Sequence, residues 1–501
     1  MKRQYLPIEA MPAWARLNGI KFDGVAIERF CSNNDSDGTD KGAAVVTKGE
    51  KFNRDPANDN NSSPEVLISV PPDMVLSPSL VESYSKSDRS LKEVLEVVGD
   101  YGKTARGAIL IFLLLQVTYS SPDFGDDKRI GISNPWSEYI KFLPADIRLP
   151  TFYTDEERYL LYGTSLKAAV DTKMASLERE FTHLCRCTET IPWCMRYWWN
   201  DSEEETGKLT FEDWKQVDAM YRSRALDLPG TGHAMVPCVD MANHASGDAA
   251  VALYETDKKG NAVLQLRWGK RMYPGDEVTI TYGDEKGASE MIFSYGFLEA
   301  EVTDARQLFL GLGIPDDDPL KSAKRSFCED APGVRLFSTC SASGATGWDS
   351  PFVWWSCINQ EDGLEFHVLE THSGIKELKA TWKDRAIGPS GCLRDIITTD
   401  PLWDVFQLRA VLILQTRLET QLAMLQETEN PFLETDHDGN GKSTGIRSDT
   451  YHVVEKLRKL EVDLLERGIR DLRQTRDDLM ASETVNAYLS QRSDDAQDDF
   501  S

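Results

Sequence analysis

The chain has 501 residues, of which 41% are hydrophobic, and it carries a formal net charge of −26 at pH 7. This length and hydrophobic content predict two or three folded units and exclude a wholly disordered chain. The negative charge argues against direct binding of nucleic acid, because phosphate contacts need a basic face, and it favours a basic protein as partner. The alternative is that the acidic side chains are spread over the surface and serve solubility alone.

The amino-acid pattern is typical of an intracellular protein. The first fifteen residues mix charges, prolines and a tryptophan, which is not the pattern of a secretory signal. The most apolar run, residues 108–117, is shorter than the ~20 residues that span a bilayer, so it predicts a buried helix. The nine cysteines show neither disulfide nor zinc-knuckle spacing. We therefore expect a cytoplasmic and/or nuclear protein with free cysteines, no metal and no membrane contact.

Apolar spacing and turn residues divide the N-terminal part of the chain into short elements. Residues 11–30 predict a short helix, a turn at Asn18 and Gly19, and then a strand. Further strands are predicted at residues 43–46 and 66–70, and polar stretches predict loops around them at residues 31–41 and 50–64.

Helical periodicity then runs from residue 90 to about residue 226. After Pro229 and Gly230 the pattern predicts short strands again, at residues 250–254, 262–268 and 277–282. Because the helical block separates two strand-rich regions, it is typical of an insertion.

The C-terminal part is strongly helical in pattern. Leucine and valine recur at i, i+3 and i+4 from Leu408 to Leu425 and from Val453 to Leu472, which predicts two long helices. Neither run keeps a strict 3.5-residue period, so core packing is favoured over a coiled coil. The acidic tail from Ser490 onward is expected to be disordered.

Residues 436–446 contain two motifs of known binding loops, and each fails at one residue. The start of the stretch matches a calcium loop of the EF-hand type, but Arg447 stands where the twelfth position must supply a carboxylate. The end of a phosphate-binding loop is also present, but Asp436 replaces its first glycine. We therefore interpret the stretch as a surface linker.

Three separated segments carry the chemistry of the chain. The first is residues 39–46 (TDKGAAVV), a glycine turn that leads into a strand. The second is residues 236–246 (VPCVDMANHAS), preceded by residues 221–225 (YRSRA). The third, residues 275–297, contains an ITYGD motif and a later Tyr-Gly-Phe. Each is weak alone, but their order, their spacing and the helical block between the first two are specific.

These segments resemble the SET-domain protein methyltransferases, in the branch that includes the Rubisco lysine methyltransferases and the fungal ribosomal-protein lysine methyltransferases. The resemblance implies an α+β fold of small β-sheets with a threaded, pseudo-knotted segment, a helical insert and a C-terminal, mostly α-helical substrate-binding domain. The implied domains are the N-terminal part of the SET domain with the cofactor turn (residues 10–90), the helical insert (91–226), the C-terminal part of the SET domain with the catalytic motifs (227–300), the helical substrate-binding domain (330–490) and an acidic tail (491–501).

The resemblance implies transfer of a methyl group from S-adenosylmethionine to a lysine of another protein, for which a ribosomal protein is one candidate. This in-line displacement requires no metal. The lysine amine must be presented without its proton, which at pH 7 costs about 4–5 kcal/mol for an ordinary pKa near 10.4. Burial among aromatic side chains beside a cationic sulfonium would lower that pKa.

The same resemblance implies residue roles. Tyr282 stands where the family keeps its catalytic tyrosine; the alternative is an ordinary strand aromatic. Asn243 and His244 match the pair that holds the cofactor, with a polar surface pair as the alternative. Arg224 matches an arginine suited to the methionine carboxylate by its planar fork, with a helix-surface salt bridge as the competing interpretation.

The implied cofactor turn comprises Thr39, Asp40, Lys41 and Gly42. The family usually has two glycines there with one residue between them, and Asp40 occupies the first of these places. Glycine permits φ > 0 and close backbone approach, which other residues resist, so this departure bears on the tightness of cofactor binding. Aspartate tolerates the left-handed region better than most residues, so the turn can still form.

The implied substrate contacts are Asp240, Tyr254 and Tyr295, with core packing as the alternative for each aromatic. Two other functions stay open. Transfer to a histidine ring nitrogen would need a wider channel with different hydrogen bonding. A non-catalytic interaction module would keep the fold but lack cofactor binding because of the altered glycine turn.

Overall fold

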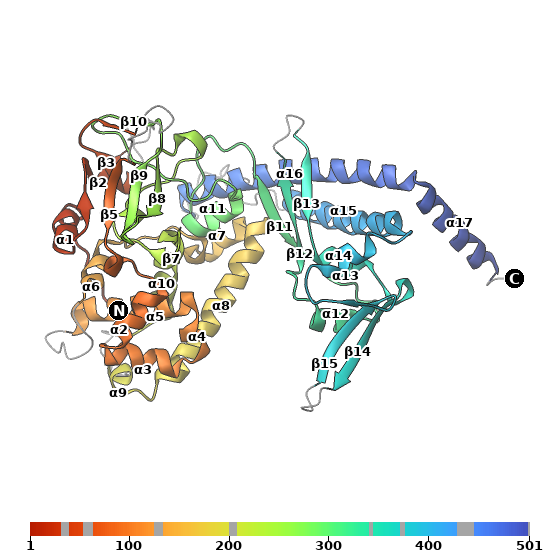
Figure 1. Ribbon diagram of the computed structural model, residues 1–501, viewed down its shortest axis with the longest axis horizontal. Coiled ribbons are helices and arrows are strands. Elements are labelled where there is room, and N and C mark those ends of the chain that lie inside the picture. The colour runs from red at the N-terminus through yellow and green to blue at the C-terminus, as the bar shows by residue number, and fades with distance from the viewer. Residues whose placement is uncertain are drawn as a thin grey trace, which may run out of the picture. The chain divides into compact units, whose positions relative to one another are not determined.

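The computed structural model describes residues 1–31, 40–53, 64–124, 134–199, 208–339, 344–370, 376–427 and 445–498 (Figure 1). The chain divides into two compact units. Unit 1 consists of Met1–Phe152, Asp171–Asp284 and Ser294–Gly296, and unit 2 consists of Tyr153–Val170, Glu285–Phe293 and Phe297–Ser501.

The strands of unit 1 form small antiparallel sheets. They are β1 (Lys21–Phe22), β2 (Val25–Cys31), β3 (Asp40–Thr47), β4 (Lys51–Phe52), β5 (Val66–Val70), β6 (Ala225–Leu228), β7 (Gly232–Met235), β8 (Ala252–Thr256), β9 (Ala262–Leu266) and β10 (Arg271–Met272). The largest sheet has the order β1-β5-β9-β8, and the other strands pair as β2-β3, β4-β10 and β6-β7. Leu67, Ile68 and Leu264 have no exposed surface, so β5 and β9 lie in the core.

The helices of unit 1 surround one apolar helix. They are α1 (Met11–Leu17), α2 (Pro78–Ser85), α3 (Arg89–Val97), α4 (Asp100–Lys103), α5 (Ala105–Ser120), α6 (Pro135–Tyr139), α9 (Pro192–Cys194) and α10 (Phe211–Arg224). Helix α5 begins after Thr104, whose hydroxyl oxygen accepts a hydrogen bond from the Gly107 amide at 3.0 Å. Its residues from Gly107 to Thr118 are all buried, because α2, α3, α4, α6 and α10 pack around it. Among the described helices, none is long and apolar enough to cross a membrane.

Unit 2 combines long helices with two three-stranded antiparallel sheets, in the orders β11-β12-β13 and β14-β15-β16. Its strands are β11 (Gln307–Gly311), β12 (Gly333–Ser338), β13 (Thr346–Asp349), β14 (Leu364–Glu370), β15 (Lys376–Trp382) and β16 (Arg385–Ile387). Its helices are α7 (Asp155–Leu160), α12 (Lys321–Phe327), α13 (Phe352–Cys357), α14 (Cys392–Ile397), α15 (Trp403–Glu427), α16 (Ser448–Met480) and α17 (Glu483–Asp498). Two further helices, α8 (Ser165–Thr188) and α11 (Ala288–Tyr295), contribute residues to both units.

The two long helices predicted from the leucine spacing are confirmed as α15 and α16, which pack along each other (Figure 1). Leu414, Leu418, Leu457 and Leu464 are at most 1% exposed, so the apolar stripes form the core of unit 2. The helical character predicted for this part is confirmed, but its strands were not predicted from the sequence. The linker at residues 436–446 lies almost wholly outside the described residues.

The expectation of a disordered tail from Ser490 is corrected by α17, whose backbone remains helical to Asp498. The sequence from Glu483 to this residue contains neither glycine nor proline, so a helix can propagate through it despite the acidic residues. The last three residues of the tail lie outside the described part of the chain.

Helix α7 belongs to unit 2, and an ion pair between a buried carboxylate and a partly exposed arginine connects it to the start of α16. The guanidinium of Arg447, the residue before α16, donates hydrogen bonds to both carboxylate oxygens of Glu157 at 2.8 Å. Burial acts against the charged carboxylate, but the bonds from Arg447 lower the pKa of Glu157 to about 2. The segment Tyr153–Val170, which precedes the Asn-His and Tyr-Gly motifs in the sequence, is thus part of unit 2 together with the C-terminal residues.

Candidate active site

The three segments singled out in the sequence meet in unit 1. The chain that carries the ITYGD motif lies between β3 and the segment of the Asn-His pair. On one side, the amide of Val278 donates to the carbonyl of Val45 at 2.8 Å. On the other side, the amide of Ile280 donates to the carbonyl of Asn243 at 2.9 Å, and Ala245 donates back to Ile280 at 3.0 Å. Backbone hydrogen bonds therefore hold residues far apart in sequence within one site.

His244 and Tyr282 contact each other directly. The backbone amide of Tyr282 donates to Nδ1 of His244 at 3.0 Å, and the two rings stack with centroids 5.1 Å apart. Because Nδ1 accepts this bond, it carries no proton in this arrangement. The side-chain amide of Asn243 donates to Oε1 of Glu277 at 2.7 Å. Both members of the Asn-His pair are thus oriented by the neighbouring strand-like segment.

The phenol group of Tyr282 lies in an aromatic cluster. Its hydroxyl donates to the carbonyl of Ala242 at 3.0 Å, and its ring lies 4.4 Å from that of Tyr295. Burial raises the pKa of Tyr282 well above its ordinary value, so the phenol is neutral at physiological pH. Tyr254 on β8 is half-buried. Its pKa is raised mainly by burial, and to a smaller extent by the negative charges of the nearby Asp227 and of Tyr295 when ionised. The structure therefore brings the three predicted tyrosines together.

Arg224, the last residue of α10, faces the segment that precedes the Asn-His pair. Its Nη1 donates to the backbone carbonyl of Asp240 at 3.0 Å and lies 3.8 Å from Oδ2 of the same residue. The Arg224 side chain is 17% exposed, whereas that of Asp240 has no exposed surface. The guanidinium of Arg224 is therefore partly exposed, and the buried Asp240 holds it in position.

Asp240 is the most strongly constrained group of the site. Its Oδ1 accepts a hydrogen bond from the phenol of Tyr139, on helix α6, at 2.5 Å. Burial raises the pKa of Asp240 to about 6, although the charge of Arg224 and the bond from Tyr139 act in the opposite direction. The carboxylate of Asp240 has no exposed surface and lies beneath Arg224, and the substrate contact predicted for this residue stays a prediction. Sequence reasoning missed Tyr139, since no motif surrounds it.

The described part of the cofactor turn is a bulged strand. Asp40 lies in β3, where it pairs with Cys31, and the register shifts between Arg29 and that cysteine. Gly42 alone takes the left-handed conformation there, with φ of +75°, and a Cβ added to it would meet no atom within 4 Å. Thr39 lies outside the described residues, and Lys41 belongs to β3.

A strained residue lies near the start of the segment of the Asn-His pair. Cys238 has φ of +71° and no exposed surface. For a residue with a Cβ, this conformation costs about 1–2 kcal/mol and persists only where the surroundings enforce it. Burial raises the pKa of its thiol, so the sulfur stays neutral. Within the described residues, no group of His, Cys, Asp or Glu side chains is placed to hold a metal ion.

The amino-acid sequence is similar to several curated proteins, whereas no family model matches the chain. It is 27% identical to SET domain-containing protein 8 of Schizosaccharomyces pombe over 434 residues, which are 85% of this chain and 90% of that protein. It is also 22% identical to an actin-histidine N-methyltransferase of Gallus gallus, over 70% of this chain and 55% of that protein. The chain thus spans about half the length of the latter relative.

Solved structures with a similar fold cover nearly the whole chain. The SET domain of LSMT bound to methyl-lysine and AdoHcy matches with a TM-score of 0.59 and 15% identity, over 95% of this chain and 94% of that one. Rubisco LSMT bound to AdoMet matches with a TM-score of 0.58 and 16% identity, over 95% of this chain and 93% of that one. At such low identity, the likeness establishes the fold.

Proposed function

Since this chain has the α+β fold of the SET-domain methyltransferases, as its sequence predicts, we propose that it transfers a methyl group from S-adenosylmethionine to a lysine of another protein. The observation that carries the proposal is the meeting of Tyr282, the Asn243–His244 pair and Arg224 in one site. Similar solved structures bound to AdoMet, AdoHcy and methyl-lysine support both the cofactor and the methyl acceptor.

The residues present fit S-adenosylmethionine. The planar guanidinium of Arg224 is partly exposed and suits a carboxylate such as that of the methionine part. The backbone at Gly42 is open to close approach, because nothing stands where a side chain would project. Asp40 lies in the same strand as this glycine, at the register shift of the β2–β3 pair. Bound there, S-adenosylmethionine would supply a methyl group activated by its sulfonium.

Tyr282 is suited to orient the acceptor nitrogen. Its phenol proton points to the carbonyl of Ala242, so the oxygen lone pairs are left to accept a hydrogen bond from an incoming amine. Its raised pKa keeps it neutral, and it therefore acts as an acceptor rather than as an ionised base. The ring of Tyr295 packs against that of Tyr282, and apolar surface beside the acceptor nitrogen would favour the uncharged amine that the reaction needs.

The substrate we propose is a lysine in a basic protein, for which a ribosomal protein is one candidate. The formal charge of −26 supports a basic partner by electrostatic attraction. A second candidate is transfer to a histidine ring nitrogen, and the relatives named actin-histidine N-methyltransferases favour it. The two candidates predict different modified side chains in the same experiment.

The proposal is tested by incubating the purified chain with cell extract and isotope-labelled S-adenosylmethionine, followed by mass spectrometry of the labelled peptides. Label on lysine supports the main proposal, and label on histidine selects the second candidate. Calorimetry with S-adenosylmethionine alone accompanies the assay. Absence of both labelling and binding at millimolar cofactor would leave a non-catalytic interaction module and end the enzymatic proposal.

A further inference from the structure

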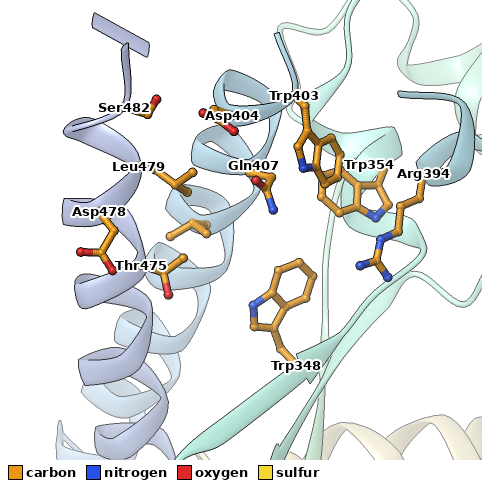
Figure 2. Close-up of a pocket in the computed structure, with 11 residues that line it drawn as sticks. Trp348, Trp354, Arg394, Trp403, Asp404, Gln407, Thr475, Asp478, Leu479 and Ser482 are labelled. Carbon is orange, nitrogen blue, oxygen red and sulfur yellow. The ribbon is translucent and has the colours of Figure 1, made fainter. Parts of the chain in front are cut away.

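Two features of unit 2 lie outside the site described above, a pocket and an open sheet edge. The pocket, of about 480 Å³, lies between the helices α15 and α16 and a wall of tryptophans (Figure 2). Trp354 in that wall is 2% exposed, its ring lies 5.0 Å from that of Trp403, and Arg394 lies over it at 5.9 Å. Contacts among its own side chains therefore close this wall, whereas the sheet edge is open.

The open edge is the outer side of β14, which projects with β15 as a hairpin from the rest of unit 2 (Figure 1). The sheet order β14-β15-β16 gives β14 one neighbour, and no described strand pairs with its other side. β14 has seven residues, whereas the other edge strands of the unit have three to five. The backbone N–H and C=O groups of such an edge are a template on which an extended segment can pair.

β14 lacks the features by which edge strands usually avoid such pairing. Native edges are protected by lysine, by proline, by a bulge or by short length. The sequence of β14, LEFHVLE, contains neither lysine nor proline. Its register with β15 runs without a shift from the pair Leu364–Trp382 to the pair Glu370–Lys376. Neither the side chains nor the backbone of β14 therefore oppose the addition of a strand.

Two consecutive apolar side chains of β14 are exposed on opposite faces of the sheet. Val368 is 64% exposed and Leu369 is 53% exposed. Because alternate residues of a strand share a face, Val368 continues the face on which Leu364 is buried and Phe366 packs against Phe327. The exposure of Val368 shows that this cover ends before it. A strand added at the edge would place side chains beside both exposed residues and shield them from water.

β14 carries two carboxylates and neither lysine nor arginine. The Glu365 side chain is 61% exposed, and Glu370, five positions further, is also exposed. The lysines of the hairpin, Lys376 and Lys379, belong to β15 and stand one strand behind the edge, where Lys379 pairs with Glu377 at 2.6 Å. Opposite charges directly across a strand pair stabilise it, and like charges destabilise it. The edge therefore favours a segment with basic residues opposite its two glutamates.

The same charges argue against a second copy of this chain at the edge. Two β14 strands side by side would bring four carboxylates together, on chains that each carry a formal net charge of −26. Like charges at this distance oppose pairing, and the net charges oppose the encounter. The partner that the edge fits is therefore a different, basic protein.

We propose that β14 binds an extended, basic segment of a partner protein as an additional antiparallel strand of its sheet. The segment has a basic residue opposite Glu370, two apolar residues opposite Leu369 and Val368, and a second basic residue opposite Glu365. Backbone hydrogen bonds along the edge supply affinity, and these side chains select the segment. The direction is antiparallel because the whole sheet is antiparallel and antiparallel pairs are the more stable. The proposal does not rest on methyl transfer.

The probe is a blocked, fluorophore-labelled peptide, Arg-Val-Val-Thr-Thr-Arg, titrated against the full chain. Fluorescence anisotropy gives its affinity, and amide hydrogen exchange followed by mass spectrometry locates it. We expect saturable binding with slower exchange in residues 364–370. N-methylation of the four central residues removes donors from both edges of the peptide and should weaken binding at least about tenfold. Arginine replaces lysine in the probe so that it offers no acceptor for the proposed methyl transfer.

Substitutions at exposed positions test the selecting side chains. Glu365→Gln combined with Glu370→Gln removes both charges and should weaken binding about fivefold. Glu377→Gln is the matched control, because Glu377 is 51% exposed in the same hairpin but lies on β15, and its effect should stay below about twofold. Val368→Lys introduces the usual protection of an edge and should weaken binding at least about tenfold. Thermal denaturation checks that each variant is folded.

Four results would overturn the proposal. They are no saturable binding at millimolar peptide, binding without slower exchange in residues 364–370, equal affinity for a peptide with glutamate in place of both arginines, and dimerisation of the chain that Val368→Lys abolishes. The last result would assign the edge to a second copy. Binding of S-adenosylmethionine and methyl transfer are measured without the probe, so failure of this proposal is distinguishable from failure of the proposed function.

Discussion

The phenol oxygen of Tyr139 lies 2.5 Å from Oδ1 of Asp240, and both side chains are buried. This hydrogen bond joins helix α6 of the helical insert to the segment that carries the Asn-His pair. Asp240 in turn contacts Arg224 through its backbone carbonyl and, at 3.8 Å, through its carboxylate. The insert therefore takes part in positioning the arginine that we assign to the cofactor.

Tyr139→Phe tests this positioning role. The substitution removes the donor to Oδ1 of Asp240, whose Oδ2 already lacks a hydrogen-bond partner within the described structure. We expect unit 1 to lose about 1–3 kcal/mol of stability and S-adenosylmethionine to bind about tenfold more weakly, as Arg224 loses its fixed position. Calorimetry and chemical denaturation measure the two effects. Tyr273→Phe is the control, because Tyr273 is 55% exposed. Unchanged cofactor affinity in Tyr139→Phe would contradict the role.

Tyr282→Phe tests the proposed orientation of the acceptor nitrogen. The variant keeps the ring that contacts His244 and Tyr295 but loses the oxygen held by Ala242. We expect turnover to fall by about 100-fold or more, since alignment of the reacting groups is lost, while the cofactor affinity stays close to that of the wild type. A single-turnover assay with labelled cofactor gives the first quantity and calorimetry the second. Wild-type turnover in this variant would remove Tyr282 from the mechanism.

Gly42→Ala tests whether the backbone of the bulged strand contacts the cofactor. Its φ of +75° is strained for alanine, which predicts a stability loss of about 1–2 kcal/mol in unit 1. Gly230→Ala is a matched control, because Gly230 has φ of +79° and the same open surroundings. We expect similar stability losses in both variants but weaker S-adenosylmethionine binding, by at least fivefold, in Gly42→Ala alone. Equal cofactor affinities would show that the ligand does not approach this glycine.

Glu461 makes the stability of unit 2 depend on pH. This residue of α16 is 1% exposed and accepts hydrogen bonds from the amide, at 2.9 Å, and the hydroxyl of Ser165. Burial raises its pKa to about 7, against about 4.3 in an unfolded chain. Between these values unfolding releases a proton, so the free energy of unfolding falls as the pH rises through this window.

We therefore expect Glu461→Gln to gain stability relative to the wild type as the pH rises from 4 to 8, by up to about 3 kcal/mol. Glutamine keeps an oxygen that can accept the bond from the Ser165 amide. Urea denaturation of unit 2 at several pH values measures the difference. Glu466→Gln, at an exposed position of the same helix, should show no such trend. A pH-independent difference for Glu461→Gln would refute the prediction.

Much of the fold was predictable because the spacing of apolar residues along the chain indicates which face of a helix or strand is buried. The apolar run from Ala108 to Val117, interrupted only by Gln116, predicted a buried helix, and that helix is the centre of unit 1. The leucine spacing likewise predicted α15 and α16. The strands of unit 2 were harder to predict from the sequence. Strand β14, for example, is mostly exposed and has no alternating apolar pattern. The acidic composition of the tail predicted disorder, whereas the absence of glycine and proline from Glu483 to Asp498 lets helix α17 form.

The sequence by itself determined the residue types and order of the site: the Asn-His pair, the Tyr-Gly motif and the arginine before them. These were readable because each motif is local, and together they indicated the fold. Only the tertiary structure decided that Asp240 is buried beneath Arg224 and bonded to Tyr139, a residue 101 positions away. Burial and long-range hydrogen bonds depend on how distant segments pack, and no local pattern encodes them.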